Sequence, residues 1–165
     1  MHVEYRAEFR CTPWQLWSFL DDAERQKLWL TTLVEFAPTS QLPRAVGTTF
    51  DMRVREGRRI SHYEGRINAY DPPRHLGVSF WGGSVPRGVA MSVDYRLADL
   101  GSKTRLEYCS EVNTESLRGP IKLALPIARV FSFFQIRYFM RNLKRLAEAA
   151  ARAESSRAPA DRRIS

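Results

Sequence analysis

The 165-residue sequence predicts an α+β domain built on a seven-stranded antiparallel sheet, and two observations support this class. Up to residue 112, apolar and polar side chains alternate over seven segments separated mostly by glycine- or proline-containing turns, which is typical of strands with one buried face. From residue 120 to about residue 153 the alternation gives way to a helical period, which predicts one long C-terminal helix.

The first strand is predicted over residues 3–9, where every second side chain is apolar. A short helix follows directly. Thr12 is its expected N-cap, Pro13 occupies its first position, and Gln15 stands three residues after the cap. This is a capping-box pattern, in which the two polar side chains each accept a hydrogen bond from the other residue's backbone N–H.

A second short helix is predicted over residues 23–30, with Asp21 or Asp22 as its cap. The β-branched residues that come next favour the start of the second strand. Of the two possible alternation phases of this strand, we favour the one that turns Val34 and Phe36 toward the interior.

The remaining strands are predicted to follow one another as a meander. Glu56-Gly57-Arg58 is a short hairpin connection. The clearest break is Tyr70-Asp71-Pro72-Pro73, because two prolines remove two backbone N–H donors and no sheet ladder can run through them. The five strands of the meander are expected at residues 47–56, 59–70, 76–81, 89–97 and 106–112.

Composition indicates one domain. With 44% hydrophobic residues the chain can bury a sizeable core, and we assign residues 1–153 to the domain and residues 154–165 to a disordered tail. The charged N-terminal segment does not resemble a signal peptide. Cys11 and Cys109 have no CxxC or Cys/His spacing, so we expect reduced thiols and no metal. The lack of a signal-peptide pattern leads us to expect a cytoplasmic protein, and we expect no cofactor.

The net charge of +8 raises the question of a polyanionic partner. Of the 26 basic residues only 4 are lysines, and the arginines are scattered through every element instead of forming a dense block. The aromatic residues fall mainly on the buried phase of strands and do not stand among exposed basic residues. We therefore do not expect nucleic acid as the partner.

The order of elements and several turn and packing positions resemble the SRPBCC superfamily, also called START-like, and within it the polyketide cyclase/dehydrase family. The likeness covers roughly residues 1–150. The positions that carry it are Thr12-Pro13-Trp14, Phe19-Leu20-Asp21-Asp22, Trp29, Gly47, Gly57, Ile67, Tyr70-Asp71-Pro72-Pro73-Arg74, Val93-x-Tyr95-x-Leu97, and Gly101 with Thr104-Arg105-Leu106.

This resemblance implies the helix-grip fold, in which the seven-stranded antiparallel sheet is wrapped around the long C-terminal helix and a cavity lies between them. It further implies an apolar or amphipathic small-molecule ligand, lipid-like or polyketide-like. A fold by itself does not establish an activity.

The alternation of the strands selects the side chains that would line such a cavity. Tyrosine hydroxyls on the inward rows could orient a ligand, although rows of this kind are also ordinary core. We predict a ligand-binding set from the strands and the long helix: Tyr5, Phe50, Met52, Tyr63, Ile67, Val78, Phe80, Met91, Tyr95, Tyr108, Phe131, Phe134 and Tyr138.

An enzyme of the polyketide cyclase/dehydrase type is the second hypothesis, and it would need a general base. The candidates are weak. Glu35 would face the interior only in the less favoured phase of the second strand, and His62 lies out of phase with the inward residues of its strand unless a bulge turns it in.

The long helix is apolar on more than one face. Phe131, Phe134 and Tyr138 share one side, while Ile136 and Met140 fall on others. The excess could be covered by the two short helices and the Gly/Pro-rich loop, by a second copy in a homodimer, or by peripheral contact with a membrane. A lipid carrier or chaperone that acts at a membrane or with a protein partner is therefore the third hypothesis.

Overall fold

The computed structural model describes residues 2–40, 43–85, 88–112 and 121–157, with the side chains of the last range described from Phe134 onward. Within these residues seven strands form one sheet of order β1-β7-β6-β5-β4-β3-β2, in which all neighbours are antiparallel. The strands are β1 (His2–Phe9), β2 (Leu33–Pro38), β3 (Thr49–Glu56), β4 (Arg59–Asp71), β5 (His75–Gly82), β6 (Met91–Asp99) and β7 (Thr104–Val112). The predicted fold class is confirmed.

The two short helices, α1 (Pro13–Asp21) and α2 (Ala23–Trp29), begin as the sequence predicts. The backbone N–H of Thr12 donates to Gln15 Oε1 at 2.9 Å and that of Gln15 donates to Thr12 Oγ1 at 3.3 Å, so both bonds of the capping box form. Asp22, one of the two expected caps, accepts the N–H of Arg25 at 2.8 Å. Since these bonds satisfy helix N–H groups that have no partner inside the helix, they set where each helix starts.

The residues of β2 that face the interior differ in part from those predicted. A β-bulge lies between Leu33 and Glu35, so that Leu33 pairs with β3 and is buried while Val34 is 36% exposed. Phe36 faces the interior as expected and its ring stacks on Phe50, with the centroids 4.8 Å apart. One extra residue in a strand reverses the alternation before it, which a regular period of two cannot anticipate.

The meander is confirmed with small shifts at the strand ends. At the proline break Arg74 N–H donates to the Asp71 carbonyl at 2.6 Å, and the Arg74 guanidinium holds the Asp71 carboxylate at 3.0 Å. The Pro72–Pro73 peptide bond is cis. These contacts close the turn between β4 and β5 and leave Leu76 to enter the core.

The long helix α3 (Ile121–Arg157) runs continuously through Pro126 and continues four residues beyond the expected end at Ala153. Ser155 Oγ donates to the Ala151 carbonyl at 3.0 Å, and Gln15 Nε2 donates to Glu154, so the last turn has local and tertiary support. The rest of the expected tail, residues 158–165, lies outside the described residues.

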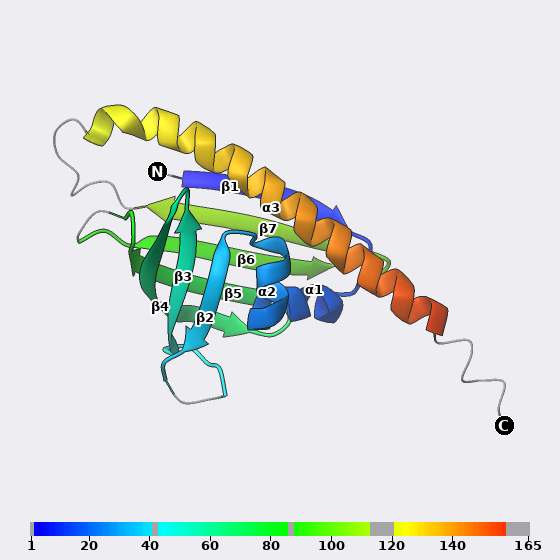
Figure 1. The fold of residues 1–165 in the computed structure, drawn as a ribbon. Coiled ribbons are helices and arrows are strands. Elements are labelled where there is room, and N and C mark those ends of the chain that lie inside the picture. Colours follow the sequence, from blue (N-terminus) through cyan, green and yellow to red (C-terminus); the bar gives the residue numbers. More distant parts are fainter. Residues whose placement is uncertain (1, 41–42, 86–87, 113–120, 158–165) are drawn as a thin grey trace, which may run out of the picture.

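Figure 1 shows α3 crossing the sheet diagonally, and its closest backbone approaches are to β1, α1 and α2. The buried stripe of α3 is Met140, Leu143, Ala147 and Ala151, and these side chains meet the sheet and the short helices. No helix among the described residues is both long and apolar enough to span a bilayer.

Two residues of α3 that were predicted to line the interior do not face it. Phe134 is 66% exposed and Tyr138 is 46% exposed, whereas Phe139 and Met140 are buried. Because this stretch of the helix is apolar on several sides, its sequence alone does not fix which side meets the sheet. The side chain of Phe131 lies outside the described part.

Candidate functional site

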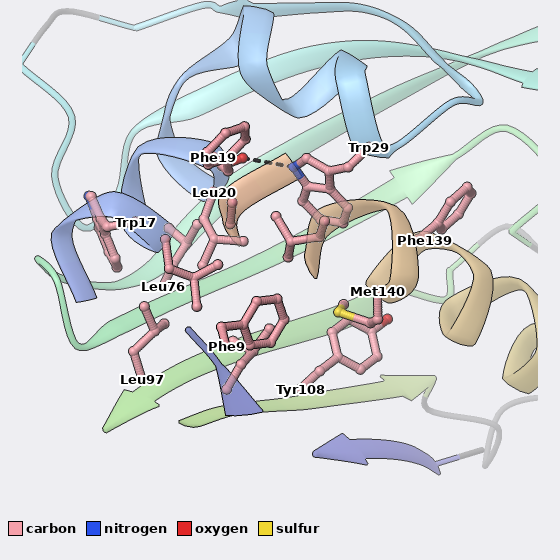
Figure 2. Packing of buried hydrophobic residues seen from close by; sticks show 14 of the residues in the cluster. Phe9, Trp17, Phe19, Leu20, Trp29, Leu76, Leu97, Tyr108, Phe139 and Met140 are labelled. Atoms are coloured by element: carbon pink, nitrogen blue, oxygen red, sulfur yellow. Dashed lines mark hydrogen bonds between the residues drawn. The ribbon is translucent and has the colours of Figure 1, made fainter. Parts of the chain in front are cut away.

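Part of the core lies at one end of the sheet, beside the short helices. Figure 2 shows Phe9, Trp29, Tyr108 and Met140 gathered between the sheet, α2 and α3. Trp29 is 1% exposed, and its indole N–H donates to the Phe19 carbonyl at 2.8 Å. This end of the interior is closed by tightly packed side chains.

Farther along the same inner face, several apolar side chains pack against the core but keep part of their surface exposed. They come from four strands, β1, β3, β5 and β6, and their phase on each strand is the one that carries the buried residues. We call this set the inner band: Tyr5, Met52, Val78, Phe80, Met91 and Tyr95.

Three tyrosines form a row across neighbouring strands. Tyr5 is the register partner of Tyr108, and Tyr108 is the register partner of Tyr95. The rings of Tyr95 and Tyr108 meet edge to face with centroids 5.4 Å apart, and the Trp29 ring also meets Tyr95 edge to face, at a centroid distance of 6.3 Å. Burial raises the pKa of Tyr108 to about 12, so its hydroxyl is protonated at neutral pH.

The Tyr95 hydroxyl makes no hydrogen bond to another described residue. Burial, and then the neighbouring Tyr108, raise its pKa well above the usual range, so it remains a neutral donor. Within the described part of the chain every sealed polar side-chain atom has a hydrogen-bond partner. The Tyr95 hydroxyl makes no such bond there, and it therefore retains some contact with open space.

A polar cluster stands at the hairpin end of the inner face. The Glu56 carboxylate accepts hydrogen bonds from Tyr63, from Ser61 and, at 2.6 Å, from Ser84. The Tyr63 ring lies so close to Gly83 that a Cβ there would overlap it, and Gly83 has a positive φ of 54°. A side chain at position 83 would therefore displace Tyr63 from Glu56.

The charge state of this cluster follows from its bonds. Burial alone would raise the pKa of Glu56, but the hydrogen bonds from Ser61, Ser84 and Tyr63 outweigh it and lower the pKa below its ordinary value. The pKa of Tyr63 is raised by burial and by Glu56. The carboxylate is thus ionised and occupied by three donors, which makes it an anchor for Tyr63 and a poor general base.

Sequence analysis missed Glu56. It shares the phase of Phe50 and Met52 on β3, so extending that inward row to the end of the strand would have placed it on the inner face. Its position beside the hairpin glycine made it look like part of a turn.

Replacing Glu56 with Gln should remove a pH-dependent part of the stability. A carboxylate whose pKa is lowered by folding adds stability above its unfolded pKa, and this contribution disappears as the pH falls through the folded pKa. We expect Glu56→Gln to be less stable than the wild type at pH 7, with the gap closing below about pH 4. Urea unfolding across this range measures it. Glu64→Gln on β4 controls for the loss of one negative charge, and a gap independent of pH contradicts the assignment.

The opposite end of the inner face has its own polar contact. Tyr70 on β4 donates to the Asp21 carboxylate at 3.1 Å, and Arg44 forms an ion pair with the same carboxylate at 3.0 Å. The Arg44 guanidinium also lies over the Phe36 ring, 5.2 Å from its centroid. These contacts tie the loop before β3 to the end of α1.

The two weak catalytic candidates lie on the outer face. Glu35 is exposed and pairs with Arg53 at 3.4 Å, and His62 is exposed and pairs with Asp51 at 3.6 Å. The bulge in β2 leaves Glu35 outside, and β4 has no bulge at His62, so both side chains stay away from the inner band.

The structure brings ten of the predicted ligand-binding residues to the inner face. Six are the inner band, and the four fully buried ones that support it are Phe50, Tyr63, Ile67 and Tyr108. Phe50 lies over Gly65, where a Cβ would overlap its ring. Whether any of the ten contacts a ligand stays a prediction.

Comparison with known proteins gives a consistent picture. Residues 1–148 match a family model described as polyketide cyclase/dehydrase and lipid transport. Uncharacterized proteins from Mycobacterium tuberculosis and Mycobacterium bovis are 30% identical over 138 residues, which is 84% of this chain and 79% of theirs.

Solved structures are similar in fold at low identity. A START superfamily protein from Mycobacterium smegmatis superposes with a TM-score of 0.71 at 12% identity, covering 90% of this chain and 98% of that one. TTHA0849 from Thermus thermophilus has the same TM-score and identity, with 92% and 99% covered. DynU16, a putative protein of the dynemicin biosynthetic locus, has a TM-score of 0.65 at 15% identity over 91% of this chain and 48% of its own.

Proposed function

The chain belongs to the polyketide cyclase/dehydrase and lipid transport family, and from that premise we propose that it binds an apolar or amphipathic small molecule against the inner band. The observation that carries the proposal is Tyr95. It lies on β6, near the middle of the sheet, yet its side chain keeps exposed surface and its hydroxyl has no hydrogen-bond partner among the described residues.

Exposed apolar surface on an inner face supports binding energetically. Each Å² of apolar surface removed from water contributes about 25 cal/mol. Val78, Phe80 and Met91 keep part of their apolar surface exposed in the folded protein, so covering it would be favourable. A ligand that covers them would gain this free energy. Among the described residues the backbone of α3 approaches β1 and the short helices most closely, and we place the ligand over the middle strands.

The polar groups favour an amphipathic ligand with a hydrogen-bond acceptor. Because Tyr95 is a neutral hydroxyl in apolar surroundings, a carbonyl, ether or hydroxyl oxygen would satisfy it, whereas a cation would gain little. An apolar wall with a few polar groups that fix orientation is the usual composition of a small-molecule site.

The direct test is to purify the protein from its own host, extract it with organic solvent and identify bound molecules by mass spectrometry. Native mass spectrometry gives the stoichiometry. We expect one amphipathic molecule per chain. If nothing is bound, titration with the fluorescent amphiphile 1-anilinonaphthalene-8-sulfonate provides the second test, and failure to bind it with a saturable stoichiometry would argue against the site.

Tyr95→Phe tests the orienting role of the hydroxyl. Loss of one neutral hydrogen bond should weaken binding of the extracted ligand by about 0.5 to 1.5 kcal/mol, with little change in stability. Isothermal titration measures it. Tyr70→Phe is the matched control, because its hydroxyl already donates to Asp21. Equal affinities of wild type and Tyr95→Phe would remove Tyr95 from the site.

A carrier that exchanges its ligand at a membrane is the second candidate, and the outer face of α3 favours it. Phe134 and Tyr138 are exposed there, and Arg137, Arg141 and Arg145 are exposed at the same helical spacing. Aromatic rings beside arginines suit an anionic bilayer surface, where the rings enter the headgroup layer and the guanidinium groups meet lipid phosphates.

Flotation with vesicles tests this candidate. We expect the wild-type protein to float with vesicles that contain phosphatidylserine and to remain below with neutral ones, and high salt should reduce floating. The double variant Phe134→Ser and Tyr138→Ser should lose the association. A control pair outside α3 is Leu28→Ser with Ile60→Ser, both exposed apolar residues. Wild-type protein absent from the floating fraction would end the idea.

A further inference from the structure

The outer face of the sheet carries a second group of side chains that the proposed function does not use. In the antiparallel register of β1 and β7, His2 stands opposite Glu111 and Glu4 stands opposite Cys109. Their neighbours in the chain, Val3 and Ser110, point to the buried side. The alternation therefore projects an imidazole, a thiol and two carboxylates together from the outer face.

The donor atoms lie near the separations that a tetrahedral metal ion requires. His2 Nδ1 is 3.0 Å from Glu111 Oε1 and 3.7 Å from Cys109 Sγ, and one ligand atom from each of the three residues lies within 4.8 Å of the others. For Zn²⁺ with Zn–N of about 2.0 Å, Zn–O of about 2.1 Å and Zn–S of about 2.3 Å, the edges of the tetrahedron are about 3.4 to 3.6 Å. A small rotation of each side chain closes the difference.

The surroundings of the three residues fit a metal site as well. Glu4 Oε1 lies 2.9 Å from His2 Nε2, so a carboxylate already holds the ring nitrogen that would face away from a metal on Nδ1. This is the usual way in which a metal-bound histidine is oriented. Glu4, Asp94 and Glu111 also place negative charge around the Cys109 sulfur, against the positive charge of Arg96.

Space for the ion and its remaining ligand is available. A hollow of about 320 Å³ opens beside Cys109 between β1, β7 and β6. It reaches Glu4 and Glu111, so a water molecule could occupy the fourth position of the metal from this side.

We propose that His2, Cys109 and Glu111 bind one Zn²⁺ ion on the outer face of the sheet. Nitrogen, sulfur and oxygen donors together match the borderline-soft character of zinc better than the oxygen-only preference of Mg²⁺ or Ca²⁺. The site was not predicted from the sequence, because His2 and Cys109 are 107 residues apart and the three ligands show no short spacing. Bound zinc would fasten the first residue of β1 to β7.

The test uses the full-length, tag-free chain, because an added histidine tag would bind zinc itself. Competition with the chromogenic chelator 4-(2-pyridylazo)resorcinol should give one Zn²⁺ per chain. We expect Cys109→Ser and His2→Gln each to weaken binding at least about tenfold, and Glu4→Gln, as a positioning change, to weaken it by about tenfold. Cys11→Ser is the matched control, since Cys11 is the buried thiol on the other end of β1.

Cobalt substitution provides a readout that a purely structural role would not move. Co²⁺ bound to the wild type should show a thiolate-to-cobalt charge-transfer band that Cys109→Ser lacks and Cys11→Ser keeps. Absence of stoichiometric zinc binding, or equal affinity in the wild type and Cys109→Ser, would overturn the proposal. Neither result affects the inner band, because the two sites lie on opposite faces of the sheet.

Discussion

Trp29→Ala should destabilise the protein by about 3 to 5 kcal/mol, which is the usual effect of removing a large buried aromatic side chain. The indole is 1% exposed, and its ring contacts Tyr95 at a centroid distance of 6.3 Å. Truncation would leave a cavity between α2 and the sheet and would also deprive the Phe19 carbonyl of its 2.8 Å hydrogen bond. Urea unfolding followed by far-UV circular dichroism measures the change without relying on tryptophan fluorescence.

Trp14→Ala is the matched control for this prediction, because Trp14 on α1 is the same residue type at 62% exposure. We expect it to change the free energy of unfolding by no more than about 0.5 kcal/mol. Trp29→Phe separates the two causes, since it keeps most of the packing and loses the hydrogen bond. Similar losses for Trp14→Ala and Trp29→Ala would show that the closed end of the interior is not where the stability resides.

The features that the sequence predicted correctly are those that depend on local chemistry. Thr12 and Gln15 form a capping box because their spacing alone brings the two bonds within reach. Pro72 and Pro73 end a strand in any context, because neither can donate to a ladder. The alternation on β1, β3, β5 and β6 places the inner band because one face of each of these strands packs against the core.

The features that the sequence did not predict depend on contacts between distant parts of the chain. Phe134 and Tyr138 face outward because the opposite side of α3, with Met140 and Leu143, packs against the sheet. A helix that is apolar on several sides does not show in its sequence which side is buried. The bulge that buries Leu33 is set by its pairing with β3. The polar cluster of Glu56 was not predicted either, because it forms between residues that lie up to 28 positions apart in the chain.

Filling the inner band with a larger side chain should abolish ligand binding, and Val78→Trp is the variant of choice. Val78 pairs with Val93 on one side and Ile67 on the other, so an indole at this position would project from the middle of the inner face. If a ligand occupies that space, the ring takes its place. We expect a loss of affinity of at least about tenfold, or 1.4 kcal/mol, for the extracted ligand or for 1-anilinonaphthalene-8-sulfonate.

The stability of the same variant decides between a ligand space and a filled core. Where open space exists, the indole covers apolar surface and the free energy of unfolding should stay within about 1 kcal/mol of the wild type, whereas overpacking a filled core typically destabilises by about 1 to 3 kcal/mol. Ile60→Trp, at an exposed position of β4, controls for adding an indole to the sheet. The proposed site would be contradicted if the Val78→Trp variant unfolded more easily and still bound the probe as well as the wild type. Lost binding together with retained stability is the combination that a ligand site over Val78 predicts, because an indole forced into a packed interior would lower the free energy of unfolding.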